Sequence, residues 1–391
     1  MKKKIILAYS GGLDTSCCVK WLKDKGYSVI CFSANLGSEF SPKQLHKMAL
    51  ASGADKIHIL DLQEEFCREY VLTALKANAV YQGGYLLSTA LGRPLIAKYL
   101  VEVARKENAC YVAHGCTGKG NDQVRIELAV KTLNPKLKII APLREWELTS
   151  RDSEVEYAKL NKIPISATHK KIYSIDKNLW GISIEAGPLE DLESEPRKDS
   201  FILTRRPEDS VSSPQNIEIE FKCGVPVKLN KKPYSLVTII KALNKIGARH
   251  SIGRTDMVED RIVGIKSREI YEAPAAWMLY TAHKELESLV LDREVRCFKE
   301  FVSSYYARVV YQGLWFTPIK QSLDSFIEKT QDFVSGRITL KLFKGKVSVV
   351  KRSSPNSLYK IKLATYSKKD EFPRNWADGF INIWSMPFIR Y

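Results

Sequence analysis

The chain has 391 residues, of which 45% are hydrophobic and 27% charged, an ordinary composition for a globular protein of two or three domains. No apolar stretch approaches the roughly 18 residues of a membrane span, so no membrane partner is expected. Lysines and arginines outnumber acidic residues by 17, but they form no dense run, and no nucleic-acid partner is expected. Eight cysteines without a Cys-x-x-Cys pair favour reduced thiols and a cytoplasmic protein.

The first 165 or so residues alternate between short apolar strands and helices. Strands are predicted at Lys4–Tyr9, Ser28–Ser33, Lys56–Leu60, Ala109–Ala113 and Lys138–Ala141, with Lys162–Ser166 as a last strand. Helices are predicted at Asp14–Lys25, Pro42–Ala51, Leu62–Lys76, Pro94–Lys106 and Asp122–Leu133. This order predicts an α/β domain over residues 1–166, with a parallel sheet and helices on both faces.

The second half predicts a different, α+β arrangement. Residues 190–216 are rich in Glu, Asp, Ser and Pro, which is typical of an exposed loop. Beyond them the pattern predicts a strand at Ile217–Lys228, a helix at Ser235–Gly247, a helical run at Pro274–Val310, and a hairpin of Arg337–Phe343 with Lys346–Lys351. We therefore expect a second domain over residues 167–360 and a C-terminal tail over 361–391.

A glycine-rich turn joins the first predicted strand to the first predicted helix. It reads Ser10-Gly-Gly-Leu-Asp-Thr-Ser16, which is neither the phosphate loop of kinases and GTPases nor a dinucleotide fingerprint. Glycines let the backbone approach an anion and the first helical N–H groups lack partners, so the turn predicts a phosphate cradle. The alternative is a glycine turn before a helix capped by Asp14 or Thr15. The pattern resembles the pyrophosphate loop of N-type ATP pyrophosphatases, which cut ATP between its α and β phosphates.

A second stretch is rich in glycine and polar residues, and it follows the predicted strand Ala109–Ala113. It reads Gly115-Cys-Thr-Gly-Lys-Gly-Asn-Asp-Gln-Val-Arg125. Its glycines let the backbone approach a ligand, and its end opens a helix. Asp122 and Arg125 are three residues apart, so their side chains lie near one helix face. An arginine there suits a carboxylate, because its planar fork binds both oxygens.

Three further stretches share this mixed polar character. They are Tyr85–Pro94, in which Pro94 is expected in the first turn of a helix, Ser174–Gly187, and Arg254–Pro274. Taken alone, the charges of the last stretch would be typical of a solvated face.

In this order and at these separations, the five stretches resemble the argininosuccinate synthase family from Ala8 to about Tyr280. The resemblance implies an adenine-nucleotide α-hydrolase-like N-terminal domain and a C-terminal α+β synthetase domain with an oligomerisation tail. It implies a cytoplasmic homotetrameric ligase of arginine biosynthesis. In the reaction that the resemblance implies, citrulline would attack ATP to give a citrullyl-adenylate and pyrophosphate, and aspartate would then displace AMP. Positioning and charge stabilisation, with Mg²⁺ on the phosphates, would carry catalysis.

The resemblance also implies roles for individual residues. Catalysis would fall to Asp14, Asp122 and Arg125. ATP would be bound by Ala8, Tyr9, Ser10, Gly11, Gly12, Leu13, Asp14, Thr15, Ser16, Ala34 and Gly115. Citrulline and aspartate would be bound by Tyr85, Thr89, Thr117, Asn121, Asp122, Arg125, Ser174, Ser183, Glu259 and Tyr271. Within these last residues, Glu259 is expected to meet the α-ammonium of citrulline and Arg125 its carboxylate. No dedicated metal ligands are expected in the protein.

The chain departs from the family pattern at three places: Ala90, where the family usually has a serine that contacts citrulline, Ser38 and Leu143. Thr89 or Ser88 could compensate for Ala90. Two other interpretations remain open from the sequence. One is an ATP pyrophosphatase that acts on RNA, and the other is an ATP-sensing or scaffold protein that has lost turnover.

Overall fold

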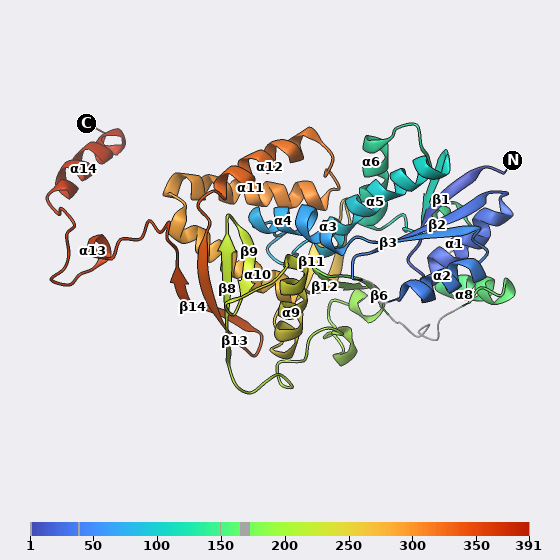
Figure 1. Cartoon of the computed structure of the whole chain (residues 1–391), viewed down its shortest axis with the longest axis horizontal. Helices are drawn as coiled ribbons and strands as arrows, with labels where there is room; N and C mark the ends of the chain where they lie inside the picture. The colour runs from blue at the N-terminus through green and yellow to red at the C-terminus, as the bar shows by residue number, and fades with distance from the viewer. Residues whose placement is uncertain (1, 38–39, 149, 165–172, 391) are drawn as a thin grey trace.

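The N-terminal part is built on a parallel sheet with β1 at its centre (Figure 1). The computed structural model describes residues 2–37, 40–148, 150–164 and 173–390. The strand order is β3-β2-β1-β4-β5, and every neighbouring pair is parallel. The strands are β1 (Lys4–Ala8), β2 (Ser28–Asn35), β3 (Lys56–Asp61), β4 (Tyr111–His114) and β5 (Lys138–Ile140). The predicted parallel sheet is therefore confirmed.

Helices cover both faces of this sheet because its central strand is apolar on both sides. Ile5 and Leu7 pack into one hydrophobic core with side chains of α1, α2 and α8, whereas Ile6 packs into another with α5 and α6. Both predicted helical layers are thus confirmed. The helices are α1 (Leu13–Asp24), α2 (Pro42–Ala51), α5 (Ser88–Glu107), α6 (Asn121–Leu133), α7 (Pro142–Glu145) and α8 (Arg151–Leu160).

One helical stretch of the N-terminal part belongs spatially to the C-terminal half. The predicted helix Leu62–Lys76 is present as α3 (Gln63–Glu65), a π-helical segment (Phe66–Val71) and α4 (Leu72–Lys76). Helix α4 packs against α10 (Pro274–Val290) and α12 (Pro318–Thr330) (Figure 1). The two halves of the chain consequently share a continuous hydrophobic core.

The C-terminal half contains two antiparallel sheets, which confirms the predicted α+β class. The order of the smaller sheet is β11-β12-β7-β6, and that of the larger is β10-β9-β8-β13-β14. The smaller is formed by β6 (Ser174–Asn178), β7 (Gly181–Glu185), β11 (Arg254–Asp260) and β12 (Lys266–Glu272). The larger is formed by β8 (Gln215–Lys222), β9 (Val225–Leu229), β10 (Lys232–Pro233), β13 (Gly336–Phe343) and β14 (Lys346–Ser353). The predicted hairpin is β13 and β14, and the predicted helix Ser235–Gly247 is α9 (Leu236–Arg249).

Two predicted elements are each split in the structure. The strand expected at Ile217–Lys228 is interrupted by a turn at Cys223 and Gly224, whose φ angles are +48° and +75°. The helical run expected at Pro274–Val310 is α10 followed by α11 (Arg293–Tyr311). The break occurs because the Asp292 carboxylate caps α11, accepting from the backbone N–H groups of Glu294 and Val295 at 3.0 Å each.

The expected strand Lys162–Ser166 is not found over residues 162–164, and Ile165 and Ser166 lie outside the described residues. The loop expected at 190–216 is confirmed up to β8, with one 3₁₀ turn at Lys198–Ser200. The buried Glu272 carboxylate anchors it by accepting the backbone N–H groups of Ile202, Leu203 and Thr204.

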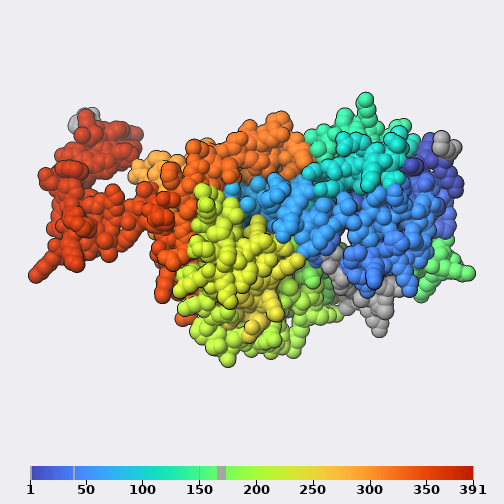
Figure 2. Space-filling model, in the orientation of Figure 1, coloured from blue at the N-terminus to red at the C-terminus, as the bar shows by residue number. Residues whose placement is uncertain are grey.

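After β14 the chain leaves the body of the molecule as an arm that carries α13 (Ile361–Ala364) and α14 (Trp376–Ser385) (Figures 1 and 2). Large apolar side chains of this arm are exposed, among them Trp376 at 72% and Trp384 at 60%. Within the described residues, no helix has the length and apolar character needed to cross a membrane.

Candidate active site

Two predicted loops meet at the carboxyl ends of β1 and β4, which are adjacent strands. Strand order runs outward from β1 in both directions, so this is the topological switch point at which open α/β sheets bind ligands. The loops touch there, because a Cβ added to Gly115 would lie 2.9 Å from Thr15 Cγ2. Glycine at 115 therefore lets the loop after β4 close onto the loop after β1.

The loop after β1 leaves the first turn of α1 without a side-chain cap. The N-cap residue is Gly12, which has no side chain to accept the N–H groups of the first turn, and no side-chain capping bond is found there among the described residues. The alternative in which Asp14 or Thr15 caps the helix is therefore wrong. Gly11 has a φ of +81°, and the Gly12 N–H donates to Ser10 Oγ over 3.2 Å. This backbone, with the uncapped helix start, is suited to an anion.

Hydrogen bonds between other side chains stabilise the conformation of this loop. The Ser16 hydroxyl is buried and lies 3.1 Å from Tyr9 Oη, and the Ser10 and Thr15 hydroxyls are also 3.1 Å apart. Ala8 ends β1, and Ala34 lies near the end of the neighbouring β2. The residues predicted for ATP thus gather around one edge of the sheet.

Asp14 has a partner that the sequence did not indicate. Glu154 on α8 is 9% exposed. Its burial, then the charge of Asp14 and a hydrogen bond with it, raise the pKa of Glu154 to about 8. Glu154 is therefore mostly protonated at neutral pH, beside the Asp14 carboxyl at the start of α1.

The predicted citrulline residues lie on one face of the β11-β12-β7-β6 sheet. Tyr271 pairs with Ser183, and Ser183 pairs with Asp176, so these side chains form a row across three strands. The alternate residues Ile270 and Ile184 turn to the other face, where they form a small core of their own. The polar face meets α5, which packs on β6 and β7.

Glu259 is the buried acid of this face and is 2% exposed. Tyr271 Oη donates to Glu259 Oε2 and Tyr311 Oη donates to Glu259 Oε1, both at 2.6 Å. Burial raises the pKa of Glu259, although the two tyrosine hydrogen bonds and the Arg125 charge oppose that rise. Tyr85 stacks on Tyr271 with 4.1 Å between ring centroids.

Tyr85 also determines where α5 begins. Its hydroxyl accepts the backbone N–H groups of Thr89 at 2.9 Å and Ala90 at 3.1 Å, two groups that have no partner inside the helix. Helix α5 consequently starts at Ser88, and Pro94 lies inside it. The expectation that Pro94 stands in the first turn is wrong, because the Tyr85 hydroxyl, four residues before Thr89, accepts the free N–H groups and lets the helix begin at Ser88.

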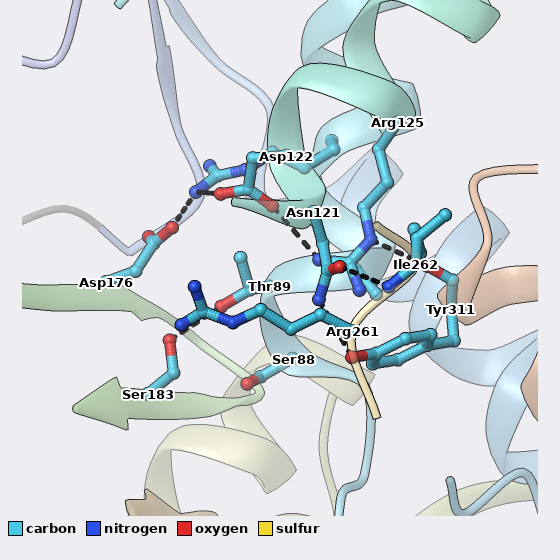
Figure 3. A network of polar contacts seen from close by, with 12 residues as sticks. Ser88, Thr89, Asn121, Asp122, Arg125, Asp176, Ser183, Arg261, Ile262 and Tyr311 are labelled. Carbon is cyan, nitrogen blue, oxygen red and sulfur yellow. Dashed lines mark hydrogen bonds and ion pairs between the residues drawn. The ribbon is translucent and has the colours of Figure 1, made fainter. Parts of the chain in front are cut away.

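Ala90 is completely buried in the hydrophobic core. The position where the family usually has serine therefore packs against neighbouring side chains. The neighbouring Thr89 Oγ1 lies 3.0 Å from Ser183 Oγ on the polar face (Figure 3). Thr89 thus presents a hydroxyl beside Ala90. The Ser88 carbonyl is engaged instead by the side-chain amide of Asn178.

Asp122 lies between two guanidinium groups (Figure 3). Arg93 Nη2 donates to its Oδ2 at 2.7 Å, and Arg125 Nη1 donates to its Oδ1 at 3.0 Å. Arg93 also pairs with Asp176 on β6. Burial alone would raise the pKa of Asp122, but Arg93 and Arg125 hold that pKa below its usual value. Asp122 is therefore an ionised group and not a proton acceptor at neutral pH.

The Arg125 guanidinium is engaged by several groups, and one of its nitrogens remains available as a donor. Its Nε donates to the Tyr311 carbonyl at 2.8 Å, and its guanidinium carbon lies 4.8 Å from the centre of the Tyr311 ring. Its Nη2 is buried, and no group among the described residues accepts a hydrogen bond from it. Asn121 completes this group by donating to Tyr311 Oη and accepting the Ile262 N–H, both at 2.8 Å (Figure 3).

The structure brings most of the predicted substrate residues together, but Thr117 and Ser174 lie at the periphery. Both are exposed, one on the loop before α6 and the other at the start of β6. Sequence reasoning gave no site role to Arg93, Asp176, Glu154, Arg261 or Tyr311. Arg93 and Arg261 lie inside the stretches singled out above, whereas Tyr311 carries no local signal.

Among the described residues, no group of three or more His, Cys, Asp or Glu side chains is arranged to hold a metal ion. A turn suited to an anion at the switch point, beside a set of paired carboxylates and guanidiniums, is typical of a nucleotide-dependent enzyme that acts on small charged substrates.

Comparison with known proteins gives the family. Residues 4–164 match the model of the arginosuccinate synthase N-terminal HUP domain, and residues 173–391 match that of the arginosuccinate synthase C-terminal domain. The argininosuccinate synthase of Pelodictyon phaeoclathratiforme is 51% identical over 391 residues, covering 100% of this chain and 98% of the relative. That of Aquifex aeolicus is 51% identical over 388 residues, covering 99% and 97%.

The chain therefore belongs to the argininosuccinate synthase family. It is an ATP-dependent ligase of arginine biosynthesis that joins citrulline to aspartate.

Proposed function

We propose that the turn Tyr9–Ser16, with Ala8, Ala34 and Gly115 beside it, binds ATP. The observation that carries this proposal is the uncapped start of α1 at the end of the central strand. Backbone N–H groups there would receive the β and γ phosphates, which leave together as pyrophosphate. The adenosine would lie toward Ala34 and Gly115.

Citrulline would lie on the polar face of the β11-β12-β7-β6 sheet. The Glu259 carboxylate would take its α-ammonium group, and the unpartnered Nη2 of Arg125 would take its carboxylate. Tyr85, Thr89, Ser174, Ser183 and Tyr271 would line the rest of this site.

Aspartate would meet Thr117, Asn121 and Asp122 near the start of α6. Because Arg93 and Arg125 keep Asp122 ionised, we assign it the task of orienting the ammonium group of aspartate, not of removing its proton. Asp122 and Arg125 would thereby place aspartate and citrulline against one another.

The ureido oxygen of citrulline attacks the α-phosphorus of ATP, the bond to the β-phosphate breaks, and pyrophosphate leaves. The ammonium group of aspartate first loses a proton to solvent, and the free amine then attacks the ureido carbon. As the new C–N bond forms, the bond from that carbon to the former ureido oxygen breaks, AMP leaves with this oxygen, and the proton released from the attacking nitrogen passes to the departing phosphate or to solvent. Mg²⁺ is commonly held by phosphates with one or two carboxylates, and Asp14 is the carboxylate of the ATP loop that fits this pattern. When bound, the ion would neutralise phosphate charge.

We also propose that the chain acts in the cytoplasm as a homotetramer, with residues 361–391 making contacts between copies. The exposed Trp376, Phe380 and Trp384 of the arm support this, because such large apolar side chains usually mark an interaction surface.

A direct test measures pyrophosphate and AMP formation with each substrate omitted in turn. We expect pyrophosphate release to require citrulline, and argininosuccinate to appear only when aspartate is added. Release that ignores citrulline and depends on tRNA would overturn the proposal. Binding of ATP and citrulline without product would instead support a protein that has lost turnover.

A further inference from the structure

Tyr311, the last residue of α11, joins two residues that we assign to different substrates (Figure 3). Its hydroxyl donates to Glu259 Oε1 at 2.6 Å and accepts a hydrogen bond from Asn121 Nδ2 at 2.8 Å. Glu259 is assigned to citrulline and Asn121 to aspartate. The roles proposed above give Tyr311 itself no task.

The direction of these hydrogen bonds is determined by the backbone. Asn121 Oδ1 accepts the N–H of Ile262 at 2.8 Å, so the amide nitrogen of Asn121 faces Tyr311. The tyrosine hydroxyl therefore accepts from Asn121, and its single hydrogen is left for Glu259. The carboxylate oxygen consequently always has a donor directed at it.

The side chain of Tyr311 is fixed by its ring and by its main chain. It is 1% exposed, and its ring stacks on Tyr81 with 3.6 Å between centroids. The Arg125 guanidinium lies over the same ring, and Arg125 Nε donates to the Tyr311 carbonyl. This carbonyl belongs to the last turn of α11, where backbone acceptors lack partners inside the helix.

Gly313 allows the end of α11 to reach this place. Its φ is +78°, and a Cβ added to it would lie 2.8 Å from Arg125 Cα. The chain that follows α11 therefore lies directly against α6. Because of this close approach, the Tyr311 hydroxyl meets Asn121 although the two residues are 190 positions apart.

The Glu259 carboxylate is held by one hydroxyl on each oxygen. Tyr271 donates to Oε2 and Tyr311 to Oε1, so the plane of the carboxylate is fixed. Each carboxylate oxygen keeps a further lone pair, which can accept an ammonium group. Without the Tyr311 hydroxyl, the carboxylate could rotate about its last bond, and a buried N–H of Asn121 would lose its acceptor.

We propose that Tyr311 is a positioning residue, which orients the Glu259 carboxylate to receive the α-ammonium group of citrulline. Tyr311 acts through Glu259 and does not itself touch the substrate. The inference rests on the proposed function in one respect, namely that Glu259 binds this ammonium group.

The test is the variant Tyr311→Phe, which removes the hydroxyl but keeps the ring and the carbonyl that hold Arg125. KM for citrulline should rise about tenfold, because a hydrogen bond to a charged group is lost. KM for ATP should not change. Tyr306→Phe is the matched control, since Tyr306 lies buried on the same helix and donates to the carboxylate of Asp324 at 2.9 Å, on α12. It should lose stability but keep the wild-type KM for citrulline.

A second measurement separates positioning from a general distortion of the site. The compound 5-ureidopentanoate has the ureido group and the carboxylate of citrulline but lacks the ammonium group. As a competitor of citrulline, it should have the same inhibition constant with the wild type and with Tyr311→Phe. Equal weakening of both ligands would overturn the inference, because the ammonium group would then have no part in the effect.

The outcomes distinguish the two proposals. If Glu259→Gln leaves KM for citrulline unchanged, the assignment of Glu259 fails, and the role of Tyr311 fails with it. If Glu259→Gln raises this KM but Tyr311→Phe keeps the wild-type value, only the inference about Tyr311 is overturned.

Replacement of Tyr311 by 4-aminophenylalanine keeps a hydrogen-bond donor at the same ring position. It should bring KM for citrulline to within about threefold of the wild-type value. This variant also takes the place of Tyr311→Phe if the latter does not fold. A rise of about tenfold or more in the amino variant would overturn the inference, since the donor would not be what matters.

Discussion

Gly11 is the point at which the ATP loop depends most directly on its backbone. Its φ of +81° lies in the left-handed region, and a Cβ built there would be 2.8 Å from Leu45 Cδ2. In Gly11→Ala, the backbone conformation should cost about 1–2 kcal/mol. Displacing the flexible end of Leu45 should cost about 1 kcal/mol more. We expect the free energy of unfolding to fall by about 2–3 kcal/mol.

The same substitution should weaken ATP binding, because relief of the strain rotates the peptide and moves the N–H groups of the loop. Loss of one hydrogen bond to a phosphate is worth about 1.5–3 kcal/mol, or roughly 10- to 100-fold in KM for ATP. Gly53→Ala is the matched control. Gly53 has a φ of +102° with open space around it, and it precedes β3 at the edge of the sheet. That variant should lose stability but keep its KM for ATP.

Urea unfolding would measure the stability change, and pyrophosphate release at saturating citrulline and aspartate would measure KM for ATP. If Gly11→Ala had the KM of the wild type while losing as much stability as Gly53→Ala, the loop would not hold the phosphates. The assignment of ATP to the end of β1 would then be refuted.

Three other predictions follow from the site and the arm. Asp122→Asn should lower kcat about 100-fold, because the guanidiniums of Arg93 and Arg125 lose the carboxylate that they share, whereas KM for ATP should stay within about threefold of the wild-type value. An unchanged kcat would show that Asp122 has no role in catalysis. Arg125→Lys should raise KM for citrulline about tenfold, since an ammonium cannot reproduce the planar fork, and an unaltered KM would refute the carboxylate assignment. Deletion of residues 361–391 should abolish the homotetramer in analytical ultracentrifugation, whereas a tetramer of the shortened chain would exclude the arm from assembly.

Local patterns were enough to predict the N-terminal sheet. The strands are short apolar runs that alternate with helical segments, so a parallel sheet could be inferred from the chain alone, whereas the order of the strands in the sheet comes from the structure. The anion loop could be predicted as well, because it depends on two consecutive glycines and the start of a helix. The assignment of individual residues to ATP, citrulline and aspartate stays a prediction.

Two helix starts were not predicted, because each is set by a side chain that precedes the helix and caps it, and not by the apolar pattern within the helix. The start of α5 was misplaced because its cap is the hydroxyl of Tyr85, held by stacking on Tyr271 from the other half of the chain. The run after Pro274 was not divided, since the cap formed by Asp292 outweighs a continuous helical pattern.

The amino-acid sequence by itself determined the class of fold, the glycine turn that we propose binds phosphate, and the resemblance to a family, because these depend on neighbouring residues and their spacing. Only the tertiary structure decided the charge state of the site. Asp122 is ionised because Arg93 and Arg125 face it, and Glu154 and Glu269 are largely protonated at neutral pH because burial and a second acid raise their pKa values. Such effects act through space and fall off with distance and solvent, so no linear pattern records them.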